Sequence, residues 1–162
     1  MLKKIFLIRH AEASLPDGAT KDFDRSLTAA GTRDATHLGQ YLAKKNLLPD
    51  VFLSSSSLRT TQTAEEIAIQ LRYENNKIQF KERLYEPSVR ELLSEINQLN
   101  HGNTAIMVTH NPSVTYLAEY LSGDPIGNMS PASCVEIDFA VDNWSEISEN
   151  SGEIINIYHP GS

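Results

Sequence analysis

The chain has 162 residues, of which 40% are hydrophobic and 22% are charged. A chain of this length is typical of one compact domain, and it can bury enough surface to be stable without a disulfide or a metal. Its formal net charge of -7 argues against partners such as nucleic acid or an anionic membrane, because both need a broadly basic protein surface. We therefore expect one domain over residues 1–162, with any anionic substrate bound at a locally basic site.

The amino terminus begins like a signal peptide, but its apolar run stops at Arg9 and is too short for a signal sequence or a membrane span. No other segment is apolar for long enough to cross a bilayer. The single cysteine, Cys134, cannot form an internal disulfide, which fits a reducing compartment, and we expect it to be a small apolar strand residue. These features favour a cytoplasmic protein.

Short β-rich runs alternate with amphipathic helical stretches through most of the chain, a pattern typical of an α/β domain with a mainly parallel sheet. The predicted strands are Lys4 to Ile8, Asp50 to Ser54, Ile78 to Phe80 and Thr104 to Thr109. The predicted helices are Thr28 to Lys45, Leu58 to Leu71, one that Ser88 caps with Glu91 as its capping-box partner, and one that begins near Pro112. The serine run Ser54 to Ser57 reads as a loop.

The last part of the chain has a different pattern. From Cys134 to Val141, apolar residues alternate with Glu136 and Asp138, which indicates a strand with one solvated face. A final strand is predicted at Glu153 to Tyr158, after a turn-rich connection. We therefore expect a three-layer α/β domain, with a central sheet flanked by helices and a C-terminal antiparallel hairpin at one edge of the sheet.

Cationic and imidazole side chains follow three of the predicted strands. Arg9 and His10 come directly after the first strand, Arg59 shortly after the second, and His110 after Thr104 to Thr109. In open parallel sheets, ligands bind outside the carboxyl ends of the strands, where loops and helix amino termini meet. Two guanidinium groups and helix amino termini at one such crevice would bind a dianionic phosphoryl group.

These residues resemble a known family. The blocks that carry the resemblance are Leu7-Ile8-Arg9-His10-Ala11-Glu12-Ala13, Leu27-Thr28-Ala29-Ala30-Gly31, Ser54-Ser55-Ser56-Ser57-Leu58-Arg59-Thr60-Thr61-Gln62-Thr63-Ala64 and Val108-Thr109-His110-Asn111-Pro112. Together they resemble the histidine phosphatase superfamily, which has the phosphoglycerate mutase-like fold. The short chain is most similar to the phosphohistidine phosphatase branch of the SixA type.

The resemblance implies that His10 is the nucleophile that becomes phosphorylated, and that Arg9, Arg59 and His110 hold the phosphoryl oxygens. The residue types suit these roles, because a neutral imidazole is a good nucleophile and its phosphoramidate is open to hydrolysis. Phosphoryl transfer needs positioning and charge stabilisation, which two arginines and a second histidine can supply without a metal or another cofactor. His10 and His110 have no third metal ligand at a useful spacing, so we expect no metal site.

The sequence leaves the general acid open. Glu86 lies between Arg59 and His110 in the chain, where phosphate-ester members of the superfamily place a catalytic carboxylate, but it also reads as a solvated loop residue. Glu12 is a second possible acid. A phosphohistidine substrate needs less help from an acid, since its leaving group departs as neutral imidazole. Asn111 has two readings: it orients the phosphate site, or it caps the following helix.

Two residues depart from the common family pattern: Ala11 follows His10, and Thr109 precedes His110, where glycines are common. Both are expected to narrow the space near the phosphate. We therefore predict a metal-independent phosphatase with a phosphohistidine intermediate and a phosphohistidine-bearing protein as its partner. The alternatives are a small-molecule phosphomonoesterase or mutase-like enzyme that acts on phosphate esters, and a phosphate-binding module without turnover.

Overall fold

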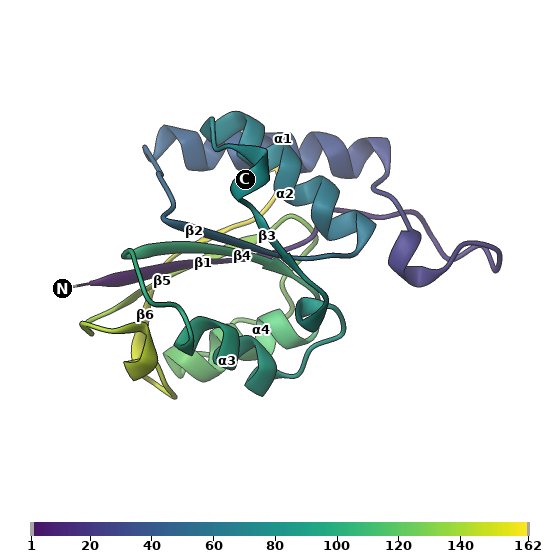
Figure 1. Cartoon of the computed structure of the whole chain (residues 1–162). Coiled ribbons are helices and arrows are strands. Elements are labelled where there is room, and N and C mark those ends of the chain that lie inside the picture. The colour runs from purple at the N-terminus through teal and green to yellow at the C-terminus, as the bar shows by residue number, and fades with distance from the viewer. Residues whose placement is uncertain (1, 162) are drawn as a thin grey trace.

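A computed structural model describes residues 2–161, which form a central sheet between two layers of helices (Figure 1). The sheet has six strands in the order β3-β2-β4-β1-β5-β6. β1 to β4 are parallel to one another, whereas β5 is antiparallel to both β1 and β6. The strands are β1 (Lys3–Arg9), β2 (Val51–Ser55), β3 (Gln79–Lys81), β4 (Thr104–Thr109), β5 (Cys134–Phe139) and β6 (Gly152–Tyr158).

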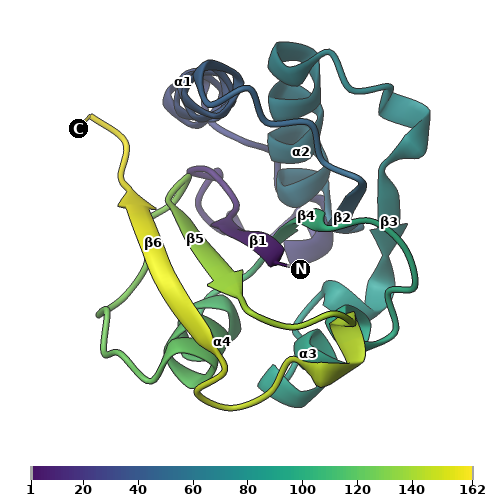
Figure 2. The same cartoon turned by 90° about the vertical axis from the view of Figure 1, so that its left-hand side faces the viewer.

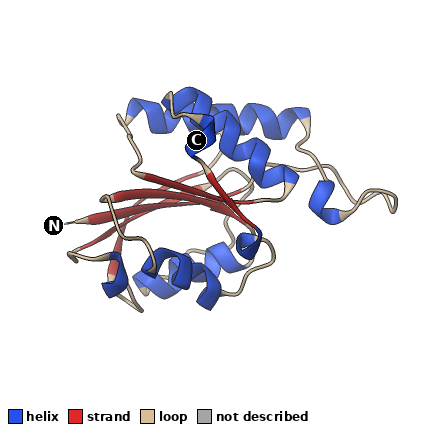
Figure 3. Cartoon of the chain, viewed as in Figure 1, coloured by secondary structure: helices blue, strands red, loops and turns tan. Residues whose placement is uncertain are grey.

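The helices cover both faces of the sheet, one pair on each side (Figures 2 and 3). One face carries α1 (Ala29–Lys44) and α2 (Leu58–Leu71), and the other carries α3 (Val89–Asn97) and α4 (Ser113–Ser122). Because neighbouring side chains of a strand point to opposite faces, β1 feeds two separate cores. Ile5 and Leu7 pack with α3 and α4 residues, whereas Phe6 and Ile8 pack with those of α1 and α2.

The predicted fold class is confirmed: the chain is a three-layer α/β domain with an antiparallel pair, β5 and β6, at one edge of the sheet. Each predicted helix and strand is present within one or two residues of the predicted ends. Ser88 caps α3 and forms the predicted capping box with Glu91. The helices α1, α2 and α4 bury apolar side chains that lie along one face of each helix.

Two local predictions are wrong. Ser54 and Ser55 are buried residues of β2 rather than loop residues, and Ser57 caps α2 by accepting a hydrogen bond from the Thr60 amide. Glu136 does not lie on a solvated face of β5: it is buried and forms ion pairs with Lys4 and with Lys45 at the end of α1. Two lysines therefore compensate a carboxylate that sequence alternation alone assigns to solvent.

Among residues 2–161, no helix is both long enough and apolar enough to span a membrane.

Candidate active site

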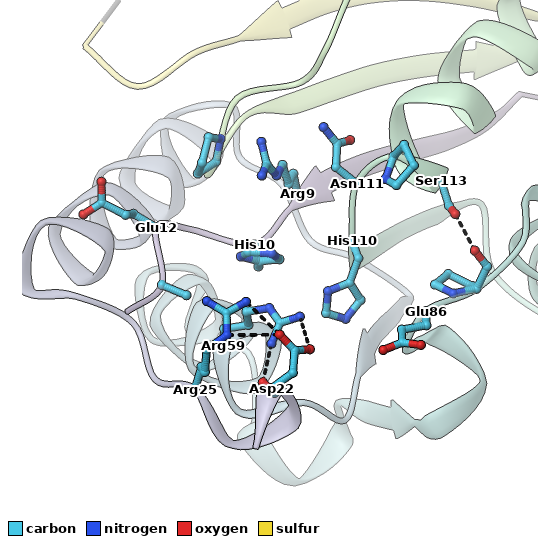
Figure 4. Close-up of a pocket in the computed structure, with 14 residues that line it drawn as sticks. Arg9, His10, Glu12, Asp22, Arg25, Arg59, Glu86, His110, Asn111 and Ser113 are labelled. Carbon is cyan, nitrogen blue, oxygen red and sulfur yellow. Dashed lines mark hydrogen bonds and ion pairs between the residues drawn. The ribbon is translucent and has the colours of Figure 1, made fainter. Parts of the chain in front are cut away.

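A cavity lies at the carboxyl ends of the parallel strands, where the loops after β1, β2 and β4 meet. Its volume is about 750 Å³ (Figure 4). It is lined by Arg9, His10, Glu12, Ala13, Asp22, Arg25, Arg59, Glu86, Pro87, His110, Asn111, Pro112, Ser113 and Pro131. The structure thus brings together all six predicted site residues, from four separate segments of the chain.

His10 follows the last residue of β1, and its backbone amide donates to the Thr109 carbonyl at the end of β4. Its ring Nδ1 lies 2.7 Å from the Ala11 carbonyl oxygen. A carbonyl only accepts hydrogen bonds, so Nδ1 carries the proton and Nε2 keeps its lone pair. Burial, together with the nearby positive charges of Arg59 and Arg9, lowers the pKa of His10 to about 4. His10 is therefore a neutral imidazole at neutral pH, with an available nucleophilic nitrogen.

His110 is buried beside His10, with the two ring centroids 5.3 Å apart. Its Nε2 lies 2.9 Å from the hydroxyl oxygen of Ser55 at the end of β2. Burial lowers the pKa of His110 to about 3, and positive charge on the neighbouring His10 and Arg59 also acts to lower it. Both histidines are therefore uncharged at neutral pH in the ligand-free protein. A bound dianion would favour their protonated forms.

Arg9 and Arg59 each present a guanidinium nitrogen that has no partner in the described structure. The Nη1 atom of Arg9 donates to the Met129 carbonyl at 2.9 Å, and Arg59 donates through Nη1 and Nη2 to Asp22, but the Nε atoms of both arginines are buried and unpaired. Buried polar groups normally have hydrogen-bond partners, so each exception calls for a physical reason. Both arginines line the cavity, and two guanidinium groups on one cavity are what an oxoanion site requires.

The sequence interpretation missed four residues in or next to this site. Asp22 and Arg25 come from the loop between β1 and α1, and Tyr85 comes from the loop before α3. Asp22 accepts hydrogen bonds from Arg59, Arg25 and the Tyr85 hydroxyl, while Arg25 adds a third guanidinium group to the cavity wall. The only sequence signal is the position of Arg25 just before the Leu27-Thr28 helix start. Ser55 was also missed, because it stands in a run of serines that resembles a loop.

The two candidate acids occupy different positions. Glu86 lines the cavity and is exposed, with a left-handed backbone conformation (φ 49°) that non-glycine residues rarely adopt. The carboxylate of Glu12 accepts a hydrogen bond of 2.7 Å from the hydroxyl of Thr28, which caps α1. Figure 4 shows Glu12 turned away from the histidine pair and Glu86 on the side of His110. The geometry therefore favours Glu86 over Glu12 as the acid.

Asn111 does not cap α4. Its Nδ2 donates to the Met129 carbonyl, which also accepts from Arg9, and its Oδ1 accepts from the Thr115 hydroxyl at 2.6 Å. The residue at the start of α4, Pro112, makes no side-chain capping bond. The capping alternative is therefore wrong, and Asn111 shares with Arg9 the carbonyl that fixes the guanidinium group.

The expected narrowing of the phosphate site by Ala11 and Thr109 is also wrong. Neither residue is part of the cavity lining in the described structure. The Ala11 side chain is buried, its backbone amide donates to the Thr63 hydroxyl at 3.0 Å, and the Thr109 hydroxyl donates to the Leu84 carbonyl at 2.8 Å. Both small side chains point into the packed interior, so they leave the cavity unchanged. Within residues 2–161, no group of three or more His, Cys, Asp or Glu side chains is arranged to hold a metal ion.

Known proteins share this fold. A protein of Nakamurella multipartitia that is assigned by name to the SixA phosphohistidine phosphatases superposes with a TM-score of 0.85, at 25% identity, over 100% of this chain and 98% of that one. A protein histidine phosphatase SixA solved with tungstate gives a TM-score of 0.81, at 22% identity, over 97% of each chain. An uncharacterized protein of Mycobacterium tuberculosis is 25% identical over 94% of this chain and 99% of its own length.

The fold and the paired histidines and arginines define a class of protein with a phosphoglycerate mutase-like architecture. Residues 5–92, more than half of the chain, match the sequence profile of the histidine phosphatase superfamily (branch 1). The chain belongs to this superfamily, as its sequence blocks indicate. Proteins of the SixA type superpose on it with TM-scores of 0.85 and 0.81, and a phosphoglycerate mutase of Bacillus anthracis superposes with a TM-score of 0.72.

Proposed function

We propose that this protein is a phosphatase that transfers a phosphoryl group to His10 and then to water, and that its preferred substrate is phosphohistidine on a partner protein. The observation that carries the proposal is the state of His10: its Nδ1 proton is held by the Ala11 carbonyl, and its neutral ring lines a cavity that Arg9 and Arg59 also line. An imidazole in this state can attack phosphorus without losing a proton first.

The reaction has two displacements. In the first, Nε2 of His10 forms a bond to phosphorus while the bond from phosphorus to the substrate's imidazole breaks, and that imidazole leaves with a proton taken from solvent. In the second, water attacks the phosphorylated His10, releasing inorganic phosphate and regenerating the neutral ring. Arg9, Arg59 and His110 stabilise the negative charge on the transferring oxygens in both steps. The chemistry is complete without a metal or another cofactor.

The choice of phosphohistidine rests on the leaving group. Imidazole leaves more readily than an alkoxide, so this substrate does not need an enclosed and strongly acidic donor. Of the two candidate acids, Glu86 is the one that lies on the His110 side of the cavity. It is exposed to solvent. An accessible site also suits a phosphorylated side chain that another protein presents.

A second candidate, hydrolysis of small phosphate esters, is favoured by one observation: Glu86 holds a strained left-handed conformation on the cavity wall. The two functions separate in the Glu86→Gln variant. If phosphohistidine is the substrate, this variant keeps its activity on a phosphohistidine-bearing carrier protein and loses only its activity on esters. Equal activity of both proteins on both substrates would remove Glu86 from the mechanism.

The proposal is tested with a panel that contains a phosphohistidine-bearing carrier protein and several small phosphate esters. We expect the highest kcat/KM on the carrier protein and no turnover by His10→Ala. The remaining alternative, a binding module, predicts that inorganic phosphate raises the melting temperature while no substrate of the panel is turned over. Full activity of His10→Ala would exclude the proposed nucleophile.

A further inference from the structure

One carboxylate reaches into an otherwise cationic part of the cavity. We propose that Asp22 is the positioning residue that fixes the Arg59 guanidinium for the phosphoryl group, and this inference rests on the proposed function. Asp22 belongs to the short helical turn Asp22–Asp24 in the loop between β1 and α1. It lies 37 positions from Arg59 in the chain, and nothing in the local sequence pattern marks it.

Asp22 holds the Arg59 guanidinium at two points. Its backbone carbonyl accepts from Nη1 at 2.7 Å, and its Oδ2 accepts from Nη2 at 3.0 Å. Arg59 is only 6% exposed, and its Nε remains unpaired. An arginine side chain has several rotatable bonds, whose ordering on ligand binding opposes affinity. With both Nη atoms fixed in advance, Arg59 needs little further ordering to receive an oxoanion.

Asp22 is itself held by Tyr85 from the loop before α3 and by Arg25 from its own loop; Figure 4 shows the contacts with Arg25. The Tyr85 hydroxyl donates to Oδ2 at 2.6 Å, and Arg25 donates to Oδ1 through Nε at 3.0 Å and Nη2 at 2.8 Å. These bonds, those from Tyr85 and Arg25 foremost, hold the pKa of Asp22 well below its ordinary range. The carboxylate is therefore ionised at neutral pH, and its hydrogen bonds join the β1–α1 loop to α2 and to the loop before α3.

The same contacts place Arg25 in the cavity lining and reduce the repulsion between Arg25 and Arg59. Two guanidinium groups on one wall repel each other, and a carboxylate between them compensates for this. Asp22 thus acts through the arginines. An anion itself, it would repel a phosphoryl oxygen at contact distance, so its contribution lies in ordering Arg59 and not in binding substrate.

The test compares Asp22→Ala and Asp22→Asn with a matched control, Asp24→Asn. Asp24 is an exposed residue of the same turn and is not part of the cavity lining in the described structure. We expect Asp22→Ala to lower kcat/KM on a phosphohistidine-bearing carrier protein by roughly 10- to 100-fold and to weaken tungstate binding by about 10-fold. Asp22→Asn keeps one acceptor oxygen and falls between Asp22→Ala and wild type, whereas Asp24→Asn equals wild type.

A double variant separates positioning from general stability. If Asp22 acts through Arg59, then adding Asp22→Ala to Arg59→Ala causes little further loss of tungstate affinity, because the group being positioned is already absent. A purely structural role would instead give additive losses. Tyr85→Phe removes one donor to Asp22 and should produce a smaller loss in the same direction. It keeps the inference testable if Asp22→Ala fails to fold.

The outcomes for Asp22 and for the proposed function are distinct. If wild type turns over no phosphohistidine, the proposed function fails, while the tungstate measurements still test the role of Asp22. If wild type is active and Asp22→Ala matches it in both kcat/KM and tungstate affinity, the role assigned to Asp22 is wrong and the proposed function stands.

Discussion

At the scale of single residues, the chemistry depends on keeping two histidines neutral among three arginines. Burial and the neighbouring cations lower the pKa of His10 to about 4 and that of His110 to about 3, whereas an unperturbed histidine titrates near 6.5. Arg9 and His10 can be predicted as a pair from their position after the first strand. The direction of the Nδ1 proton cannot, because it depends on the backbone carbonyl of Ala11 within a loop.

The neutral state of His10 predicts its titration. Between about pH 6.5 and pH 4, His10 is protonated in the unfolded chain but should stay neutral in the folded protein, because its pKa there is lowered to about 4. NMR of the imidazole nitrogens in the ligand-free protein measures this directly, with Nδ1 protonated and Nε2 bare at pH 7. A midpoint near 6.5 for His10 would contradict the account, as would a proton on Nε2 at pH 7.

At the scale of elements, the predicted and observed bounds agree best where particular residues mark the start or the end of a helix or strand. The predicted bounds of Leu58–Leu71 and Thr104–Thr109 match the observed α2 and β4, because Ser57 caps the helix and His110 follows the buried apolar strand. Long loops have neither a repeating apolar pattern nor marked ends. Asp22 and Arg25 therefore escape sequence reasoning, since their partners are fixed by tertiary packing and not by spacing.

The start of α1 offers a test of how an element positions the site. Gly31 packs so closely against the loop after β1 that a Cβ atom there would lie 2.1 Å from the Glu12 carbonyl oxygen. Because backbone must move to relieve this overlap, Gly31→Ala should lower the free energy of unfolding by about 1–3 kcal/mol. The displaced loop carries Asp22 and Arg25, so kcat/KM should fall as well.

Chemical denaturation and kinetics of Gly31→Ala check both effects. The exposed Arg33 in the same helix provides the control, since Arg33→Ala should change neither quantity appreciably. A Gly31→Ala protein with wild-type stability and activity would contradict the expected link between the packing of Gly31 and the cavity.

At the scale of the whole molecule, a net charge of -7 coexists with one basic cavity. Some acidic residues elsewhere form ion pairs, and the clearest case is Glu136 on β5, which lies between Lys4 and Lys45. Sequence alternation could not predict this burial, because it depends on where the end of α1 packs over the sheet. Composition thus excludes a broadly basic surface but not a basic site.

The Glu136 cluster predicts a pH-dependent contribution to stability. Burial opposes its ionisation, but hydrogen bonds from Lys4 and Lys45 lower the pKa of Glu136 below its ordinary value. Glu136→Gln should therefore lower the free energy of unfolding at pH 7 by about 2 kcal/mol. The lowered pKa means that this contribution is present above about pH 4.5 and is lost as the pH falls through the folded value.

Denaturation curves at pH 7 and below pH 4.5 measure the effect, with Glu153→Gln as the control because Glu153 is an exposed residue of β6. The difference between wild type and Glu136→Gln should shrink at the lower pH, while Glu153→Gln stays close to wild type at both. An equal deficit of Glu136→Gln at both pH values would assign its effect to packing instead of charge.

The most direct test of the central claim is a rapid-quench experiment that traps the phosphorylated enzyme. Wild-type protein is mixed with a phosphohistidine-bearing carrier protein that is labelled on phosphorus, quenched in alkali, and mapped by mass spectrometry. The account predicts an acid-labile, alkali-stable phosphoryl group on His10, formed before inorganic phosphate appears and absent in His10→Ala. Release of phosphate without any labelled enzyme, or a label on a residue other than His10, would contradict it.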